Sequence, residues 1–325
     1  MTSVLSLNNL KVTFRTKRGQ LYAVRGVTID IEQGECLGIV GESGSGKTVM
    51  WRAAMGLLRG QSVQRDGAAI LENTELFTLS WKEVRQLWGT SIAMVFQDPM
   101  TALNPVRRIG SQFSESLVKR LGMSKSEAAE RIIELLKLVH MPEPEKLVRK
   151  YPHQLSGGMR QRVMIAMAIS CNPKVLLADE PTTALDVTVQ AQVLDLLSEL
   201  REKLGMAMVI ITHDLGIVAG HSDRIAVMYA GEIVELATTA DLFANTRMPY
   251  TEALLNSIPK LTDVSGCKMR VIPGSPPDPV ATAKGCFFAP RCNYARDRCH
   301  SEHPELVDGG NSHHYRCFFP LGKGE

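Results

Sequence analysis

Residues 41–48 read Gly-Glu-Ser-Gly-Ser-Gly-Lys-Thr, which matches the phosphate-binding pattern G-x-x-x-x-G-K-[ST] at every fixed position. Glycines let such a loop turn its backbone N–H groups towards phosphates, and the following helix adds the positive end of its dipole. Lys47 is expected to reach the β- and γ-phosphates, and the Thr48 hydroxyl is expected to bind Mg²⁺. We therefore expect this loop to bind a nucleoside triphosphate through Gly41, Ser43, Gly44, Ser45, Gly46, Lys47 and Thr48.

The residues on either side of the loop support this interpretation. The apolar run 36–40 is typical of a buried strand, and residues 48–58 read as a helix. A glycine-rich turn that carries Lys-Thr by chance is the alternative, but it does not explain this strand–loop–helix order.

Two carboxylates end a second apolar run, at residues 174–180. Asp179 fits the acidic residue that helps to hold Mg²⁺ in P-loop enzymes, and Glu180 could polarise an attacking water. The alternative is that both acids cap the turn at 181–183, but this does not explain their place at the end of a buried strand.

A polar residue also ends the apolar run 208–212, where the next residue is His213. A lone histidine is more often structural than catalytic. Its position at the end of a buried strand, as for Glu180, favours a role in the reaction.

Two further positions are candidates for contacts with a nucleotide. Phe14 could stack on an adenine ring or could equally be an aromatic at the edge of a sheet. Gln97 follows an expected strand at 91–96 and precedes a proline-containing loop at 98–105, so by itself it reads as a turn residue.

A second helix is expected to begin at Ser156, Gly157 and Gly158. The exposed N–H groups at its N-terminus would form another anion site. One chain needs only one such site for one triphosphate. The arrangement is explained if this helix start completes the site of another subunit.

The remaining elements alternate between strands and helices. Strands are expected at 5–14, 22–31 and 68–71, and helices at 80–87 and 187–204. Residues 110–150 are helical in character and contain a capping box, Ser124 with Glu127, so we expect a helical insert that is not part of the sheet.

The composition indicates a folded protein of 325 residues, with 44% hydrophobic and 22% charged residues. The net charge of +3 is too small to favour nucleic acid as a partner. No apolar run approaches the roughly 18 residues of a membrane span, and the first residues lack the features of a signal peptide. We therefore expect the chain to remain in the cytoplasm and to serve a membrane only through a partner.

Taken together, these motifs resemble the nucleotide-binding subunit of ATP-binding-cassette (ABC) transporters. The resemblance is carried by 41–48, Gln97, 155–159, 175–180, 184–186 and His213. It implies an α/β P-loop domain at 1–258, with a RecA-like core, an antiparallel β subdomain and a helical subdomain at about 104–172. The departure is Met159, where this signature usually ends in glutamine.

The resemblance also implies a mechanism, in which two cassettes pair head to tail around two ATP molecules. Each site then takes the phosphate loop of one subunit and residues 156–158 of the other. Glu180 would act as general base, Gln97 would contact Mg²⁺ and the water, and His213 would contact the γ-phosphate. Asp186 would lie in the loop that crosses the dimer seam, and 98–105 would dock a membrane subunit.

The composition of the chain changes from about residue 259. A proline-rich segment at 273–277 is followed by four cysteines: Cys286, Cys292, Cys299 and Cys317. Disulfides are not expected beside a cytosolic ATP site. The spacing C-x5-C-x6-C-x17-C lacks the close pair that zinc usually takes and matches no common ferredoxin run, so it leaves zinc and an iron–sulfur cluster open. Cys36, Cys171 and Cys267 are expected to be core or spare thiols.

The sequence of the tail resembles the C-terminal extension of oligopeptide and dipeptide importer ATPases. The matching residues are 249–251, 285–286, 289–292, Ala295 and Cys299. The resemblance implies that 259–325 is this extension, that its four cysteines hold a [4Fe-4S] cluster, and that the chain is an ATPase for peptide import. It also implies a related second ATPase as a heterodimer partner, two membrane permeases, an extracytoplasmic binding protein, and a place on the cytoplasmic face of the inner membrane.

Other functions stay open at this point. Related importers carry nickel, opines or oligosaccharides, and soluble cassette proteins act on ribosomes or DNA without moving a solute. A nucleotide-binding scaffold with an inactive site is a third alternative, but the intact Lys47, Asp179, Glu180 and His213 argue against it.

Overall fold

The computed structural model of this chain describes residues 3–183, 185–258, 272–280 and 284–322. Ala184, which belongs to one expected motif, and Cys267 lie outside the described residues. The chain divides into two compact units, each described by itself below. Unit 1 comprises residues 1–4, 31–35 and 78–210, and unit 2 comprises 5–30, 36–77 and 211–325.

Unit 1 contains two parallel strands, β6 (Ile92–Val95) and β7 (Val175–Asp179), paired from Ile92↔Val175 to Val95↔Ala178. Every residue of both strands is buried, which explains why their sequences are continuous apolar runs and do not alternate. Helix α7 contacts β6 and helix α8. The unit's helices beside the strands are α2 (Trp81–Leu87), α3 (Pro99–Ala102), α7 (Gly157–Ala168) and α8 (Val187–Leu204), with a 3₁₀ turn η1 (Pro152–Gln154).

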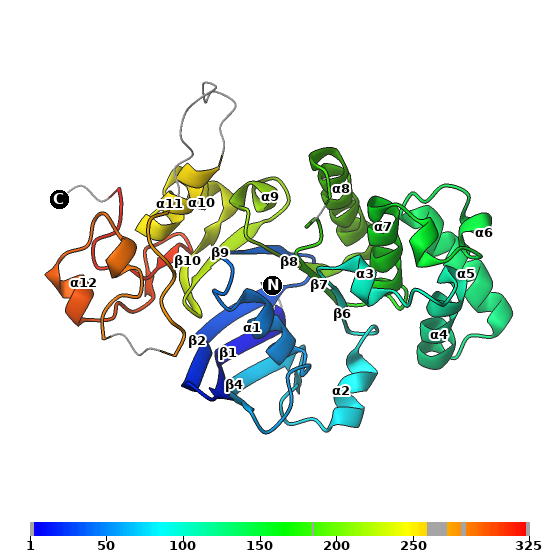
Figure 1. Ribbon diagram of the computed structural model, residues 1–325, viewed down its shortest axis with the longest axis horizontal. Coiled ribbons are helices and arrows are strands. Elements are labelled where there is room, and N and C mark those ends of the chain that lie inside the picture. The colour runs from blue at the N-terminus through cyan, green and yellow to red at the C-terminus, as the bar shows by residue number, and fades with distance from the viewer. Residues whose placement is uncertain (1–2, 184, 259–271, 281–283, 323–325) are drawn as a thin grey trace. The chain divides into compact units, whose positions relative to one another are not determined.

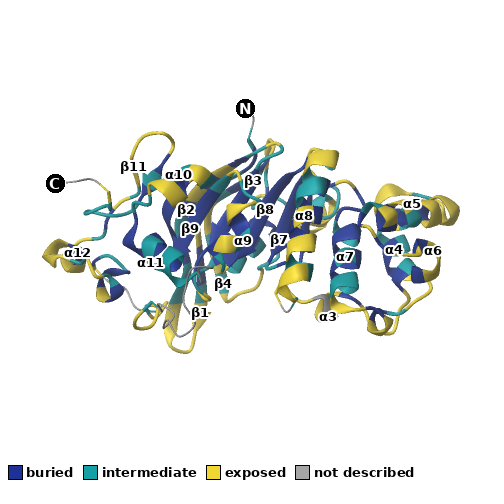
Figure 2. Ribbon diagram, turned by 90° about the horizontal axis from the view of Figure 1, so that it is seen from above, coloured by how far each residue is buried: buried dark blue, intermediate teal, exposed yellow. Residues whose placement is uncertain are grey.

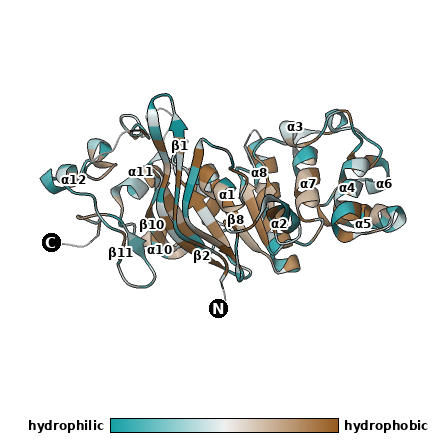
Figure 3. Cartoon of the chain, turned by 90° about the horizontal axis from the view of Figure 1, so that it is seen from below, coloured by the Kyte–Doolittle hydropathy of each residue, from teal (hydrophilic) through white to brown (hydrophobic). Residues whose placement is uncertain are grey.

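The helical insert predicted at 110–150 is confirmed as α4 (Ile109–Leu121), α5 (Lys125–Leu138) and α6 (Pro144–Leu147). The predicted capping box is present, because Glu127 N donates to Ser124 Oγ at 3.3 Å and Ser124 N donates to Glu127 Oε2 at 2.8 Å. Helix α5 carries hydrophobic and hydrophilic residues on different parts of its surface (Figure 3), as a helix packed against α4 and α7 requires.

Unit 2 contains most of an antiparallel sheet with strand order β2-β1-β4-β5. In β1, the buried positions are first Leu5 and Leu7 and then Leu10 and Val12. The buried positions change from odd to even numbers because of a β-bulge at Asn9, whose φ is 48°. The one extra residue of the bulge shifts which of the following side chains face the core. The strands are β1 (Ser3–Thr16), β2 (Gly19–Glu32), β4 (Val63–Leu71) and β5 (Thr74–Glu75).

The second set of strands in unit 2 begins with β3 (Cys36–Val40), which is parallel to β9 (Arg224–Tyr229). From β9 the order continues antiparallel through β10 (Glu232–Thr238), β12 (His314–Tyr315) and β11 (Val307–Asp308). β3 and β9 are buried along nearly their whole length (Figure 2). The chain passes from unit 1 to unit 2 within β8 (Ala207–Thr212).

The helices of unit 2 are short (Figure 1): α1 (Lys47–Ala54), α9 (Leu215–Ala219), α10 (Thr239–Ala244), α11 (Pro249–Ser257), η2 (Ala289–Arg291) and α12 (Asp297–Ser301). Helix α1 ends at Ala54, four residues before the predicted end. Gly56 adopts φ 69° there, and Leu57 N and Gly56 N donate to Arg52 O and Ala53 O, which is a Schellman ending. Among the described residues, no helix has the length and apolar character needed to cross a membrane.

A buried histidine connects the end of the chain to β10. His313 Nε2 lies 2.8 Å from Glu235 Oε1, and its Nδ1 lies 2.6 Å from Asp241 Oδ2. Glu235 also accepts from the backbone N–H groups of Arg247 and Met248. Both ring nitrogens therefore face carboxylates, an arrangement that favours the charged imidazolium.

This contact makes the stability of unit 2 depend on pH. The hydrogen bond to Glu235, with that to Asp241, raises the pKa of His313 above its ordinary value of 6.5 although burial opposes the shift. Because the folded pKa lies above the unfolded one, the stabilisation is complete below about pH 6.5 and is lost as the pH rises through the folded pKa. We expect the melting temperature of the wild type to fall more steeply between about pH 6 and pH 8.5 than that of His313→Gln.

Calorimetry at both pH values measures this difference. His314→Gln is the matched control, because His314 is the next residue in the chain and its Nδ1 faces the backbone oxygen of Ser312. Equal pH dependence in the wild type and both variants would show that His313 does not titrate with folding.

Candidate nucleotide-binding site

The phosphate-binding loop of unit 2 connects β3 to α1, as predicted. Gly41, Gly44 and Gly46 all have positive φ, at 156°, 82° and 102°. A Cβ on Gly41 would overlap the carbonyl oxygen of Met228, and one on Gly46 would overlap that of Ala23. The loop can therefore take this path only with glycine at its two ends.

Lys47, the first residue of α1, turns back over this loop. Its side chain is buried, and Nζ donates to Gly41 O at 2.6 Å and to Glu42 O at 3.0 Å, with Ser45 Oγ at 3.5 Å. A cation thus lies inside the curve of backbone that the motif predicts to surround phosphates. Thr48 is half-buried beside it, while Ser43 and Gly44 are exposed at the tip of the loop.

In unit 1, the two predicted carboxylates end β7. Asp179 is fully buried, and Glu180 adopts φ 46°, a left-handed conformation that is unusual for glutamate. Gln97 Nε2 donates to Glu180 Oε2 at 2.7 Å, and Thr183 Oγ1 donates to the same oxygen at 2.9 Å. The structure therefore brings Gln97 and Glu180 together and fixes the direction of the carboxylate.

Thr183 is a residue that the sequence analysis missed. It appeared only as part of a turn after the strand, and its hydroxyl reaches back to Glu180 because that residue adopts a left-handed conformation. Nothing in the sequence marks the left-handed conformation of Glu180 that makes this contact possible.

The second predicted anion site lies at the start of α7. Ser156 is the N-cap, and its Oγ accepts from Met159 N at 3.3 Å. Ser156 and Gly157 are exposed, and a Cβ on Gly158 would come within 2.8 Å of Val189 Cγ1. Asp186 has a similar structural role as the N-cap of α8, where its Oδ1 accepts from Val189 N at 2.9 Å.

The structure places the other two predicted residues in unit 2. His213 is exposed directly after β8, and Phe14 is half-buried near the end of β1, opposite Val63. Their contacts with γ-phosphate and adenine stay predictions.

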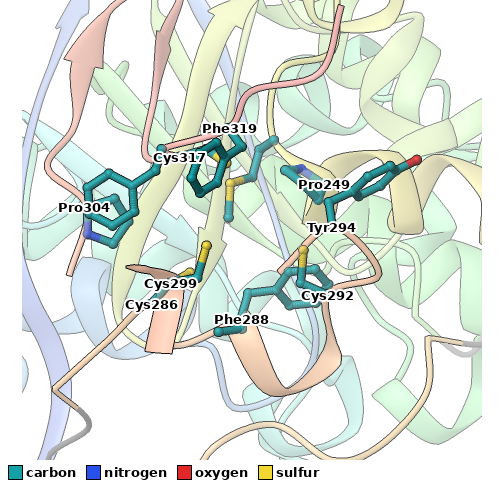
Figure 4. Close-up of a pocket in the computed structure, with 12 residues that line it drawn as sticks. Pro249, Cys286, Phe288, Cys292, Tyr294, Cys299, Pro304, Cys317 and Phe319 are labelled. Carbon is teal, nitrogen blue, oxygen red and sulfur yellow. The ribbon is translucent and has the colours of Figure 1, made fainter. Parts of the chain in front are cut away.

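The four cysteines of the tail line one pocket of unit 2 (Figure 4), and none of the six described cysteines is in a disulfide. Burial, with smaller contributions from the charges of Cys286, Cys292 and Cys299, raises the pKa of the Cys317 thiol to about 12. Within the described ranges, no three His, Cys, Asp or Glu side chains are grouped so that they could hold a metal ion. Cys36 and Cys171 are buried, as expected.

The folds and site residues described above define a P-loop nucleotide-binding protein. A model of the ABC transporter family matches residues 24–183, and a model described as oligopeptide/dipeptide transporter, C-terminal region, matches residues 234–299. Two solved structures share the fold. The dimeric bacterial ABC transporter cassette MJ0796 matches with a TM-score of 0.65 and 31% sequence identity, and the match covers 72% of this chain and 98% of that structure. The structure of cbiO1 from Clostridium perfringens matches with a TM-score of 0.64 and 29% identity, and the match covers 75% of this chain and 92% of that structure.

Curated relatives extend the similarity to the full length. The dipeptide transport ATP-binding protein DppD of Bacillus subtilis is 47% identical over 100% of this chain and 97% of its own length. The oligopeptide transport ATP-binding protein OppD of Salmonella typhimurium is 48% identical over 98% of this chain and 94% of its own. This chain belongs to the oligopeptide/dipeptide group of ABC transporter ATP-binding proteins.

Proposed function

We propose that this chain hydrolyses ATP to power the import of dipeptides or oligopeptides across the cytoplasmic membrane. The observation that carries the proposal is the similarity over the whole chain, tail included, to relatives named for dipeptide and oligopeptide transport. An ABC domain alone would support ATP hydrolysis but would leave the cargo open.

The chemistry follows from the site residues. Lys47 and the loop amides would bind the phosphates, while Thr48, Asp179 and Gln97 would hold Mg²⁺, which supplies positive charge for phosphoryl transfer when bound. Glu180, oriented by Gln97 and Thr183, would take a proton from the attacking water. His213 would contact the γ-phosphate, and Phe14 would stack on adenine.

The partners follow from the same family. A related second ATPase would pair head to tail, so that Ser156, Gly157 and Gly158 of each subunit face the nucleotide of the other and Asp186 lies at the seam. Two membrane permeases would dock on the segment at 98–105, which was expected to be a loop and contains the short helix α3, and a binding protein outside the membrane would deliver peptide. We place the chain on the cytoplasmic face of the membrane through these permeases.

Affinity purification of the tagged chain from detergent-solubilised membranes tests this assembly. We expect two permeases and a second ATPase to be recovered with it, and import of a labelled dipeptide to be lost when its gene is deleted. Loss of nickel, opine or oligosaccharide uptake with normal peptide import would assign another cargo. Recovery of ribosomes or DNA without permeases would assign the chain to the soluble cassette proteins.

We further propose that Cys286, Cys292, Cys299 and Cys317 hold a [4Fe-4S] cluster. All four thiols line one pocket, and its burial favours the neutral thiol unless a positively charged centre stabilises the thiolates. The described residues contain no group of three His, Cys, Asp or Glu side chains placed to hold a metal ion, a single zinc ion included, which needs each sulfur about 2.3 Å from the metal. A cluster distributes the same four ligands over several irons and accepts a wider arrangement.

Metal content measures this proposal directly. In protein purified without oxygen, we expect iron and acid-labile sulfide in equal amounts, about four of each per chain. The Cys292→Ser variant should lose both, whereas Cys171→Ser, in unit 1, should keep them. Zinc in place of iron would overturn the cluster and leave the ATPase assignment unchanged.

A further inference from the structure

A buried arginine of the tail reaches the phosphate-binding loop. Arg291 Nη1 donates to Glu42 Oε2 at 2.6 Å, and Arg291 Nη2 donates to Glu42 Oε1 at 2.9 Å. The two residues are 249 positions apart in the chain, and the Arg291 side chain is only 4% exposed. Such a bidentate contact fixes both the position and the orientation of the carboxylate.

Glu42 is also held at its backbone. Its N–H donates to the hydroxyl of Tyr250 at 2.9 Å, and its carbonyl oxygen accepts from Lys47 Nζ at 3.0 Å and from Ser45 N at 3.2 Å. Lys47 and Ser45 are residues of the phosphate-binding pattern itself. A displacement of Glu42 would therefore move the amino group and the amide that the triphosphate is expected to contact.

Arg291 is in turn fixed by the tail. Its Nε donates to Pro273 O at 2.8 Å, and Nη1 also donates to Tyr229 Oη at 3.2 Å. Its guanidinium lies over the rings of Tyr229 and Phe288. The next residue is Cys292, which lines the cysteine pocket, so one short turn carries both the arginine and a pocket thiol.

A second part of the tail approaches the same loop. Residues 276–279 and residues 42–45 line a common hollow, and Tyr22 N donates to Pro279 O at 3.0 Å. The tail therefore meets the loop at two places within unit 2, which a single surface contact would not explain.

The charges give the arginine a specific effect on nucleotide binding. Glu42 places a carboxylate, 27% exposed, in the loop that is expected to bind phosphates. A negative charge there opposes a negative ligand unless a cation compensates for it. Arg291, whose side chain is buried, provides that cation.

We propose that Arg291 is a positioning residue for ATP: it neutralises Glu42 and holds the loop through it, so that the C-terminal tail is a working part of the nucleotide site. This inference depends on the proposed ATP binding. It assigns the tail a role in nucleotide affinity that is separate from the proton transfer at Glu180.

Titration calorimetry with MgATP on the purified full-length chain tests the inference. We expect Arg291→Ala to raise the Kd for MgATP about tenfold, as an uncompensated charge near the ligand predicts. In the assembled transporter the same variant should raise KM and leave kcat nearly unchanged, since it loses binding common to the ground and transition states. Arg291→Lys keeps the positive charge but not the bidentate contact, so it should raise the Kd for MgATP less than Arg291→Ala does.

Two further variants separate positioning from simple loss of structure. Arg131→Ala is the matched control, because it removes an arginine that pairs with Glu134 on α5 in unit 1, and it should bind MgATP as the wild type does. Glu42→Gln combined with Arg291→Ala should bind MgATP better than Arg291→Ala alone, because the unpaired carboxylate is gone.

The outcomes distinguish this inference from the proposed function. If the wild type does not bind MgATP, the proposed function itself fails. If the wild type binds MgATP and both Arg291→Ala and Arg291→Lys bind it with the affinity of the wild type, Arg291 has no part in the site. If Arg291→Ala is too unstable to measure, unchanged affinity and KM in Arg291→Lys would overturn the inference.

Discussion

Glu180→Gln is expected to bind MgATP with nearly the affinity of the wild type and to lose a factor on the order of 10²–10⁴ in turnover, the usual contribution of a general base. Glutamine has almost the same shape and can still accept from Gln97 and Thr183, which hold this side chain in the structure. It cannot take a proton from water at neutral pH. Phosphoryl transfer depends otherwise on positioning and charge, so binding should survive.

Single-turnover ATPase assays and MgATP titration measure the two quantities separately. Glu130→Gln, on the exposed side of α5, is the matched control and should leave both unchanged. Hydrolysis at a near-normal rate by Glu180→Gln would remove this carboxylate from the mechanism. Loss of MgATP binding would instead assign Glu180 a role in holding the nucleotide.

Gly46→Ala is expected to weaken MgATP binding by a factor on the order of 100. The residue has φ 102°, which costs roughly 1–2 kcal/mol for alanine, and its new Cβ would overlap the carbonyl oxygen of Ala23. Because that oxygen belongs to the backbone of β2, it is the loop that must move, and a forced shift of this kind adds about 1–3 kcal/mol. The moved loop begins the helix that carries Lys47 and Thr48.

Gly44→Ala provides the comparison within the same loop. Gly44 also has a positive φ, 82°, but no atom lies within 4 Å of an added Cβ. This variant should show only the backbone strain and should bind MgATP about tenfold or more better than Gly46→Ala. Equal affinities of the two variants for MgATP would contradict the close approach of Gly46 to β2.

Much of the fold could be predicted because local patterns determine it. The limits of β3 at 36–40 and of α8 at 187–204 agree with the predictions, since the first is a short apolar run and the second begins with the N-cap Asp186 and ends before Gly205. Helix α1 was predicted too long because its apolar residues continue beyond Gly56, while the glycine ends the helix in the structure.

The candidate site was predictable only in part. The residue types of 41–48, Asp179 and Glu180 follow from motifs with a known chemistry. The contact of Thr183 with Glu180 depends on a left-handed residue after a strand, which has no clear pattern in a single sequence. The pair of Arg291 with Glu42 joins residues 249 positions apart, and neither residue belongs to a motif that predicts the other.

The most direct test of the proposed function is ATP-driven uptake by the purified transporter in lipid vesicles. With MgATP on the side of this chain and a peptide-loaded binding protein on the other, we expect a labelled dipeptide to cross the membrane. The same vesicles with Glu180→Gln in this chain should bind MgATP and transport very little. Uptake of peptide that continues at the wild-type rate without ATP or with this variant would contradict the account. Transport of nickel or an oligosaccharide in place of peptide would contradict its choice of cargo.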